Sequence, residues 1–117
     1  MTATASSACR LLVLPGDGIG PEISAATVAV LKAVDARFGL GLTLETADIG
    51  FAALRGPAGT TFPSSVLEAA RTVDGVVLGP VSHNEYPASD KGGLNPSGQL
   101  RKQLDLYANI RPARSRP

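Results

Sequence analysis

Two arginine residues near the carboxyl end of the chain carry the side chain best suited to binding a dicarboxylic acid. Arg101 falls in a helical pattern, and Arg111 follows ten positions later, after a segment with the pattern of a strand. A guanidinium group donates two parallel hydrogen bonds to a carboxylate, so two such groups could clamp a diacid. An arginine on a helix is, without further context, more often a solvated surface residue. The residue types alone leave both interpretations open.

A glycine-rich loop near the amino end is a candidate for binding an anion. Residues 16–22 read Gly-Asp-Gly-Ile-Gly-Pro-Glu and lie between an apolar segment and a helical pattern, where backbone amides often meet phosphate or carboxylate groups. Gly16 and Gly18 are therefore candidate contacts with a cofactor. The Rossmann pattern needs a glycine five positions after the first, where Pro21 stands. The loop is not a dinucleotide fingerprint, and a tight turn before a helix is the competing interpretation.

The other side chains that could take part in chemistry are not expected to be catalytic residues or to form a metal site within this sequence. His83 is the only histidine, and we expect it to make a polar loop contact rather than to act as a base. Cys9 is the only cysteine and is expected to be a passive thiol, as in a reducing compartment. The aspartates Asp17, Asp48 and Asp74 lack the spacing of a calcium loop.

Segments of different periodicity predict the elements that must position these residues. Apolar or alternating runs at 11–14, 42–46 and 76–78 predict strands, with helices from Pro21 to Gly39 and from a capping box at Ser65 and Glu68. Residues 50–63 are expected to form a loop. This order predicts an α/β sandwich with a mostly parallel sheet and ligand sites beyond the carboxyl ends of its strands. The expected core includes Leu12, Val30, Val77 and Leu104.

The carboxyl-terminal third of the chain is expected to be a long polar loop followed by a helix and a strand. The loop covers residues 79–95, the helix runs from a Ser97 cap to Leu106, and residues 106–110 form the strand. The basic tail that follows predicts a truncated chain. We expect a frayed leader at residues 1–10 and the amino-terminal part of a larger protein at 11–117. The chain is expected to leave its first domain near residues 100–117.

Composition excludes several other classes of protein. Apolar residues make up 44% and charged residues 18% of the chain, which is typical of a globular protein. A formal net charge of +1 provides no general attraction for nucleic acid or an anionic membrane. No run approaches the roughly 20 apolar residues of a membrane span. The expected location is the cytoplasm.

Two motifs together resemble the isocitrate/isopropylmalate dehydrogenase family. They are Val13–Glu22 and the stretch from Leu100-Arg101-Lys102 through residues 106–113, and segments 62–63 and 74–79 fit the family's order between them. The resemblance implies an isopropylmalate dehydrogenase-like fold, which is not a Rossmann fold, in a two-domain homodimer. It also implies NAD or NADP with Mg²⁺ or Mn²⁺, and oxidative decarboxylation of a 2-hydroxy diacid.

The same resemblance implies roles for individual residues. Arg101 and Arg111 match the two arginines that hold the substrate carboxylates. Residues 84–97 match the segment along the nicotinamide and the substrate's variable group, so Asn84 is a cofactor candidate and Asn95 and Ser97 are substrate candidates. The family's catalytic tyrosine and lysine and its metal-binding aspartates lie later in the sequence than Pro117. The 117 residues by themselves are therefore expected to be inactive.

The identity of the acid stays open at this stage. Residues 95–98 read Asn-Pro-Ser-Gly where isopropylmalate enzymes place leucines, which favours isocitrate, malate or tartrate-like substrates. Residues 107–113 read more like the isopropylmalate branch. Two alternatives from other classes are an inactive fragment or pseudo-domain that binds a partner, and a phosphate-binding module built on residues 16–20.

Overall fold

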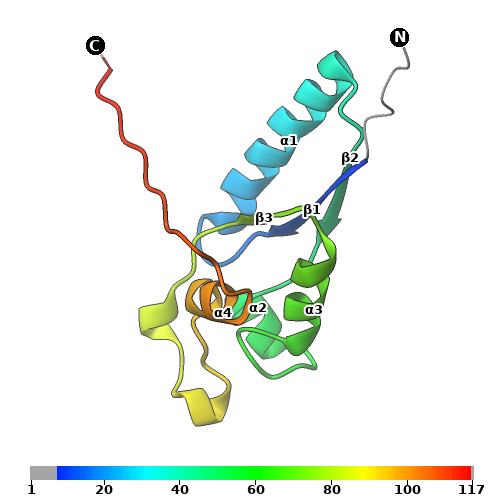
Figure 1. The fold of residues 1–117 in the computed structure, drawn as a ribbon. Coiled ribbons are helices and arrows are strands. Elements are labelled where there is room, and N and C mark those ends of the chain that lie inside the picture. Colours follow the sequence, from blue (N-terminus) through cyan, green and yellow to red (C-terminus); the bar gives the residue numbers. More distant parts are fainter. Residues whose placement is uncertain (1–7, 117) are drawn as a thin grey trace.

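The computed structural model describes residues 8–116, and these residues contain a single parallel sheet. Its strands are β1 (Cys9–Leu14), β2 (Leu42–Thr46) and β3 (Gly75–Leu78), in the order β2-β1-β3, and both pairings are parallel. The helices are α1 (Gly20–Phe38), α2 (Gly50–Arg55), α3 (Ser64–Thr72) and α4 (Pro96–Gln103), with short 3-10 turns η1 (His83–Glu85) and η2 (Ser89–Lys91) before α4 (Figure 1). The predicted α/β fold class with a mostly parallel sheet is confirmed.

The core lies on the side of the sheet where α3 and α4 pack. The continuous apolar run of β1 makes it the central strand, paired on both edges, and Leu12 is only 1% exposed as predicted. Leu104 and Val77, also predicted in the core, are both half-buried. Leu104 packs against the core cluster, whereas Val77 on β3 is not part of that cluster. The buried cluster consists of Leu12, Leu14, Ile49, Phe62, Val66, Leu67, Ala70 and Leu100.

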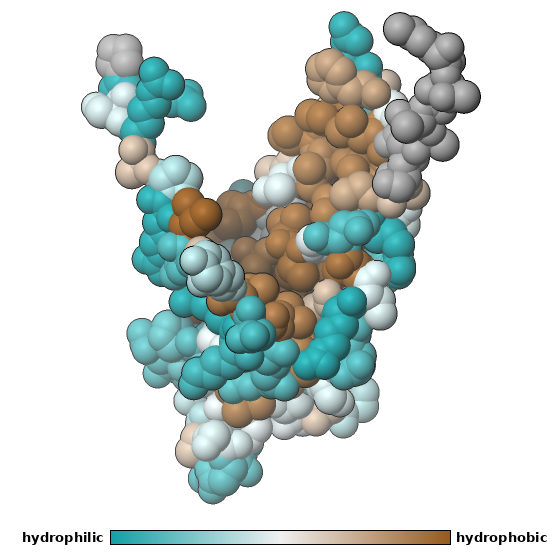
Figure 2. Space-filling view, in the orientation of Figure 1, coloured by the Kyte–Doolittle hydropathy of each residue, from teal (hydrophilic) through white to brown (hydrophobic). Residues whose placement is uncertain are grey.

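Helix α1 differs from the prediction in its burial. It ends at Gly39 as expected, because that residue adopts a left-handed conformation with φ 63°. Its apolar side chains are largely exposed, however: Val30 is 62% exposed, so its predicted place in the core is wrong. Figure 2 shows apolar residues gathered over α1 and the adjoining sheet. Helical periodicity identifies the apolar side of a helix but not what covers it. No helix among residues 8–116 is long and apolar enough to cross a lipid bilayer.

Several local predictions about helix starts are wrong. Residues 50–55, expected to be in a loop, form α2. Helix α3 begins at Ser64 after Pro63 and has no side-chain cap, so Ser65 lies inside the helix and the expected capping box is absent. Helix α4 is capped by Asn95, whose side chain accepts a hydrogen bond from the Gly98 amide at 3.3 Å, and not by Ser97. A proline lies at the start of both helices: Pro63 is the N-cap residue of α3, and Pro96 is the first residue of α4. At these positions the missing N–H of proline costs the helix no hydrogen bond.

The strand expected at residues 106–110 is not formed. Helix α4 ends at Gln103, Asp105 has a positive φ of 51°, and Tyr107 is 103% exposed. Figure 1 shows the tail running away from α4. A strand needs a partner for its ladder of hydrogen bonds, and the described residues place none beside this segment.

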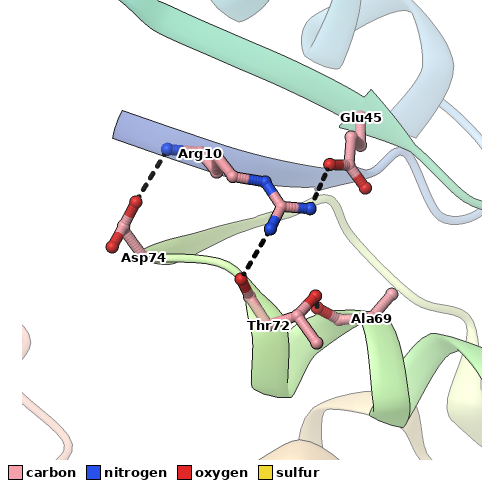
Figure 3. A network of polar contacts seen from close by, with 5 residues as sticks. All are labelled: Arg10, Glu45, Ala69, Thr72 and Asp74. Carbon is pink, nitrogen blue, oxygen red and sulfur yellow. Dashed lines mark hydrogen bonds and ion pairs between the residues drawn. The ribbon is translucent and has the colours of Figure 1, made fainter. Parts of the chain in front are cut away.

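Arg10 ties the amino end of the sheet together on the surface. Its amide donates to the Asp74 carboxylate at 2.8 Å, and its guanidinium donates to the Thr72 carbonyl at 3.1 Å and to Glu45 at 2.6 Å (Figure 3). The hydrogen bond and the charge of Glu45 raise the pKa of Arg10. Strand β1 begins at Cys9, so the last two residues of the leader expected at 1–10 belong to the sheet. The first seven residues of that leader lie outside the described part.

Candidate functional site

A buried carboxylate lies where the three parallel strands end. Asp17, in the loop after β1, is 7% exposed and accepts three hydrogen bonds. Its Oδ1 accepts from the Phe51 amide at 2.8 Å, and its Oδ2 accepts from the Ser82 amide at 3.0 Å and from the Tyr86 hydroxyl. These donors come from α2, which follows β2, and from the loop after β3. One side chain therefore joins the loops after all three strands, at the edge where parallel α/β sheets bind ligands.

The loop after β3 is closed into a turn against this carboxylate. Ser82 and Tyr86 flank η1, and the Glu85 amide donates to the Ser82 carbonyl at 2.8 Å. The Tyr86 ring also packs edge-on against Phe51, with 5.1 Å between the ring centroids. Burial and the hydrogen bond to Asp17 raise the pKa of Tyr86 well above its ordinary value. The residues between the two contacts, including Asn84 and His83, are exposed.

Close backbone packing explains the glycine at position 16. A Cβ atom on Gly16 would lie 2.1 Å from the Pro80 carbonyl oxygen, and the neighbouring Asp17 amide donates to that oxygen at 2.8 Å. Gly18 is exposed, with a φ of 56°, and a Cβ atom there would meet no other atom within 4 Å, so its glycine serves the turn conformation. The tight-turn interpretation accounts for both residues. Their contact with a cofactor stays a prediction.

A second buried polar side chain fastens the far end of the long loop. Thr61 is 0% exposed; its Oγ1 accepts from the Leu94 amide at 2.7 Å and its own amide donates to the Gly92 carbonyl at 2.9 Å. The Thr61 carbonyl in turn accepts from the Gly50 amide at 2.8 Å. Residues 79–95 are therefore held near both ends by buried groups from other segments, which explains how so polar a loop is ordered.

Three of the predicted substrate residues lie together at α4. Asn95 caps the helix, and Ser97 in its first turn accepts a hydrogen bond from Nη2 of Arg101 at 2.7 Å. Arg101 is exposed. Arg111 lies in the exposed tail, and among the described residues it makes no hydrogen bond or ion pair. The structure thus groups Asn95, Ser97 and Arg101 and does not join Arg111 to them.

The cavity beside α4 is chemically unlike a diacid site. It encloses about 490 Å³ between α3, β3 and α4. Asp74, Ser97 and Arg101 contribute polar groups to its wall, but most of its lining is aliphatic: Ala70, Val73, Val76, Leu78, Leu100, Leu104 and Leu106. An apolar wall offers a carboxylate no hydrogen bonds, so this space is better described as an uncovered side of the core.

The described residues do not by themselves form a complete cofactor or metal site. Within residues 8–116, no group of three acidic, histidine or cysteine side chains comes together as metal ligands. The Asp17 carboxylate already accepts three hydrogen bonds. Neither the cavity beside α4 nor a smaller one of about 210 Å³ beside α2 contains Gly16, Gly18 or Asn84. These three residues offer contact points at one edge of the sheet, outside both cavities.

Sequence patterns do not reveal the residues that organise this edge. They present Asp17 as one of several scattered aspartates and assign no role to Tyr86, Phe51 or Thr61. The partners of Asp17 are 34, 65 and 69 positions away along the chain. The one available signal is an aspartate between two glycines at the end of a buried strand, which suggests a special environment but does not identify its partners.

Comparisons with known proteins agree with this architecture. The family model described as isocitrate/isopropylmalate dehydrogenase matches residues 10–117. The 3-isopropylmalate dehydrogenase of Geobacillus kaustophilus is 47% identical over 105 residues, covering 88% of this chain and 28% of the relative. That of Xanthomonas euvesicatoria is 43% identical over 106 residues, covering 89% of this chain and 29% of the relative.

A solved structure shows the same likeness in three dimensions. The β-decarboxylating dehydrogenase of Thermococcus kodakarensis, in its apo form, aligns with a TM-score of 0.67 and 34% identity over 85% of this chain and 27% of that one. The chain therefore spans less than a third of the length of these relatives. The match over residues 10–117, with the parallel sheet and its sequence motifs, means that the chain belongs to the isocitrate/isopropylmalate dehydrogenase family.

Proposed function

We propose that the full-length protein carrying this chain catalyses the NAD- or NADP-dependent oxidative decarboxylation of a 2-hydroxy diacid of the 3-isopropylmalate, isocitrate or tartrate type. The family match over residues 10–117, with relatives named 3-isopropylmalate dehydrogenase, is the observation that supports this most strongly. When bound, the nicotinamide accepts hydride and Mg²⁺ or Mn²⁺ stabilises negative charge during decarboxylation. We further propose that the protein acts as a homodimer in the cytoplasm.

In this proposal the chain's own contribution is to bind and orient the acid. Arg101 uses Nη2 for its bond to Ser97, and no other hydrogen bond of its guanidinium occurs within residues 8–116, so further N–H groups remain for a carboxylate. Arg111 provides the second guanidinium. Two forked contacts hold the diacid in one orientation and so lower the entropic part of the barrier. Asn95 and Ser97 border the substrate, and Asn84 contacts the cofactor.

Replacing each arginine by lysine in the full-length protein tests this assignment. Lysine keeps the charge but loses the fork, so we expect Arg101→Lys or Arg111→Lys to lower kcat/KM by at least ~10-fold without unfolding the protein. Arg55→Lys, at an exposed arginine in the last turn of α2, is the matched control. Steady-state kinetics with a panel of 2-hydroxy diacids provides the measurement and identifies the acid. Wild-type efficiency in both variants would contradict the clamp.

The alternative is a pseudo-domain that binds a partner without catalysing a reaction. The exposed apolar side chains of α1, among them Ile23, Val30 and Phe38, favour this alternative. We expect the isolated 117 residues to reduce no cofactor, because arginine contacts supply only part of the stabilisation of the transition state. Cofactor reduction by the full-length protein, followed by its absorbance, separates the two functions.

A further inference from the structure

Two of the three contacts of Asp17 involve one short turn in the loop after β3. Both donors to Oδ2, the Ser82 amide and the Tyr86 hydroxyl, flank the same three-residue turn, η1. The middle residue of that turn is Asn84, two positions from either contact. A single oxygen atom therefore holds the turn on both sides of Asn84, whose side chain faces solvent.

The other Asp17 oxygen connects this turn to the rest of the sheet edge. Oδ1 accepts from the Phe51 amide at 2.8 Å, and the Phe51 ring packs against Tyr86. The carboxylate has little freedom to move, because a Cβ atom on Gly50 would lie 2.3 Å from Oδ1. Three hydrogen bonds and this close packing leave Asp17 unavailable to a substrate. It acts through the residues that it holds.

We propose that Asp17 is a positioning residue that, through Ser82 and Tyr86, holds the η1 turn so that Asn84 meets the nicotinamide cofactor. The role rests on the proposed function of the full-length protein. Removing the Tyr86 hydroxyl releases one side of the turn while the ring keeps its contact with Phe51. Asp17→Asn is more severe, because an amide NH₂ in place of Oδ2 would face the Ser82 N–H, which is also a donor.

Two measurements on the full-length protein test the proposal, with Tyr86→Phe as the main variant. Hydrogen exchange reports local opening of the turn, and we expect exchange at the Ser82 amide to become about tenfold faster while exchange in β1 is unchanged. Steady-state kinetics should give a KM for the cofactor raised about threefold or more with kcat little changed. Asp48→Asn, which removes an exposed carboxylate at the same sheet edge, should change neither quantity.

A double variant tests whether Asp17 and Tyr86 act as one unit. If they do, Asp17→Asn with Tyr86→Phe raises the cofactor KM no further than Asp17→Asn alone. Faster exchange at Ser82 with an unchanged cofactor KM would overturn the positioning role, and so would unchanged exchange. A wild-type protein that turns over no diacid would instead refute the proposed function. In that case titration of wild type and Tyr86→Phe with NAD or NADP decides the inference: weaker binding to the variant supports it, and equal binding or none overturns it.

Discussion

The two ends of β1 are held by opposite kinds of charged side chain. At the amino end, the exposed Arg10 pairs with the carboxylate of Glu45, and both side chains are more than 40% accessible. At the carboxyl end, the buried Asp17 accepts hydrogen bonds from two backbone amides and a phenol and has no ionic partner among the described residues. Water competes for the first set of contacts and is excluded from the second.

The two sets of contacts should therefore differ in how firmly they hold the neighbouring segments. An exposed ion pair gains little because both groups are well solvated when they part. A buried carboxylate that lost its donors would stay desolvated, so its contacts fix the loops around it much more strongly. Small substitutions around the carboxyl end of β1 should therefore lower the stability of the protein more than substitutions around its amino end. Three variants, in order of expected effect, test this.

The largest effect is expected for Gly50→Ala at the carboxyl end. Gly50 has a φ of +67° and its Cβ would meet both Asp17 oxygens within 2.5 Å, so the substitution combines left-handed strain with overpacking. We expect the free energy of unfolding to fall by about 3 to 4 kcal/mol. Gly59→Ala is the control, because Gly59 has a similar φ of +61° and open space around it; it should lose only about 1 kcal/mol. Equal losses in urea unfolding would show that Asp17 is not tightly held.

An intermediate effect, with a characteristic pH dependence, is expected for Tyr86→Phe. At neutral pH the variant should lose about 1.5 to 3 kcal/mol, the usual contribution of a hydrogen bond to a charged group. The pKa of Tyr86 is raised in the folded protein, so its contribution is present below the unfolded value of about 10 and is lost as the pH rises through the folded pKa. Wild type should therefore lose stability above about pH 10 more steeply than Tyr86→Phe does. Parallel curves from denaturant unfolding across this range would contradict the assignment.

The smallest effect is expected for Glu45→Gln at the amino end. Arg10 keeps its bonds to Thr72 and, through its amide, to Asp74. The lost attraction is exposed, so the decrease in thermal stability should be slight and should vanish in about 1 M salt, where charges are strongly screened. If this variant proves as destabilised as Tyr86→Phe, the contrast between the two ends of the strand is not real.

Local sequence patterns predict most of the elements but only part of the site. The run Leu11–Leu14 indicates a central strand, and Gly39 marks the end of α1. Arg101 is correctly placed on a helix near Asn95 and Ser97, because residues close in sequence on one helix are also close in space. The predicted serine caps at Ser65 and Ser97 are wrong, because the helices begin one or more residues earlier, next to prolines. The predicted strand at 106–110 is also wrong, since propensity does not reveal whether a segment finds a partner.

The sequence by itself determined the α/β class, the mostly parallel character of the sheet and the family, because short-range periodicity and two local motifs carry that information. Only the tertiary structure decided that Val30 is exposed, that Thr61 is buried, and that Asp17 gathers the loops after all three strands. These outcomes depend on contacts between residues tens of positions apart. A pattern that repeats every two or four residues specifies the side of an element on which a residue lies, but not which distant residue will meet it there.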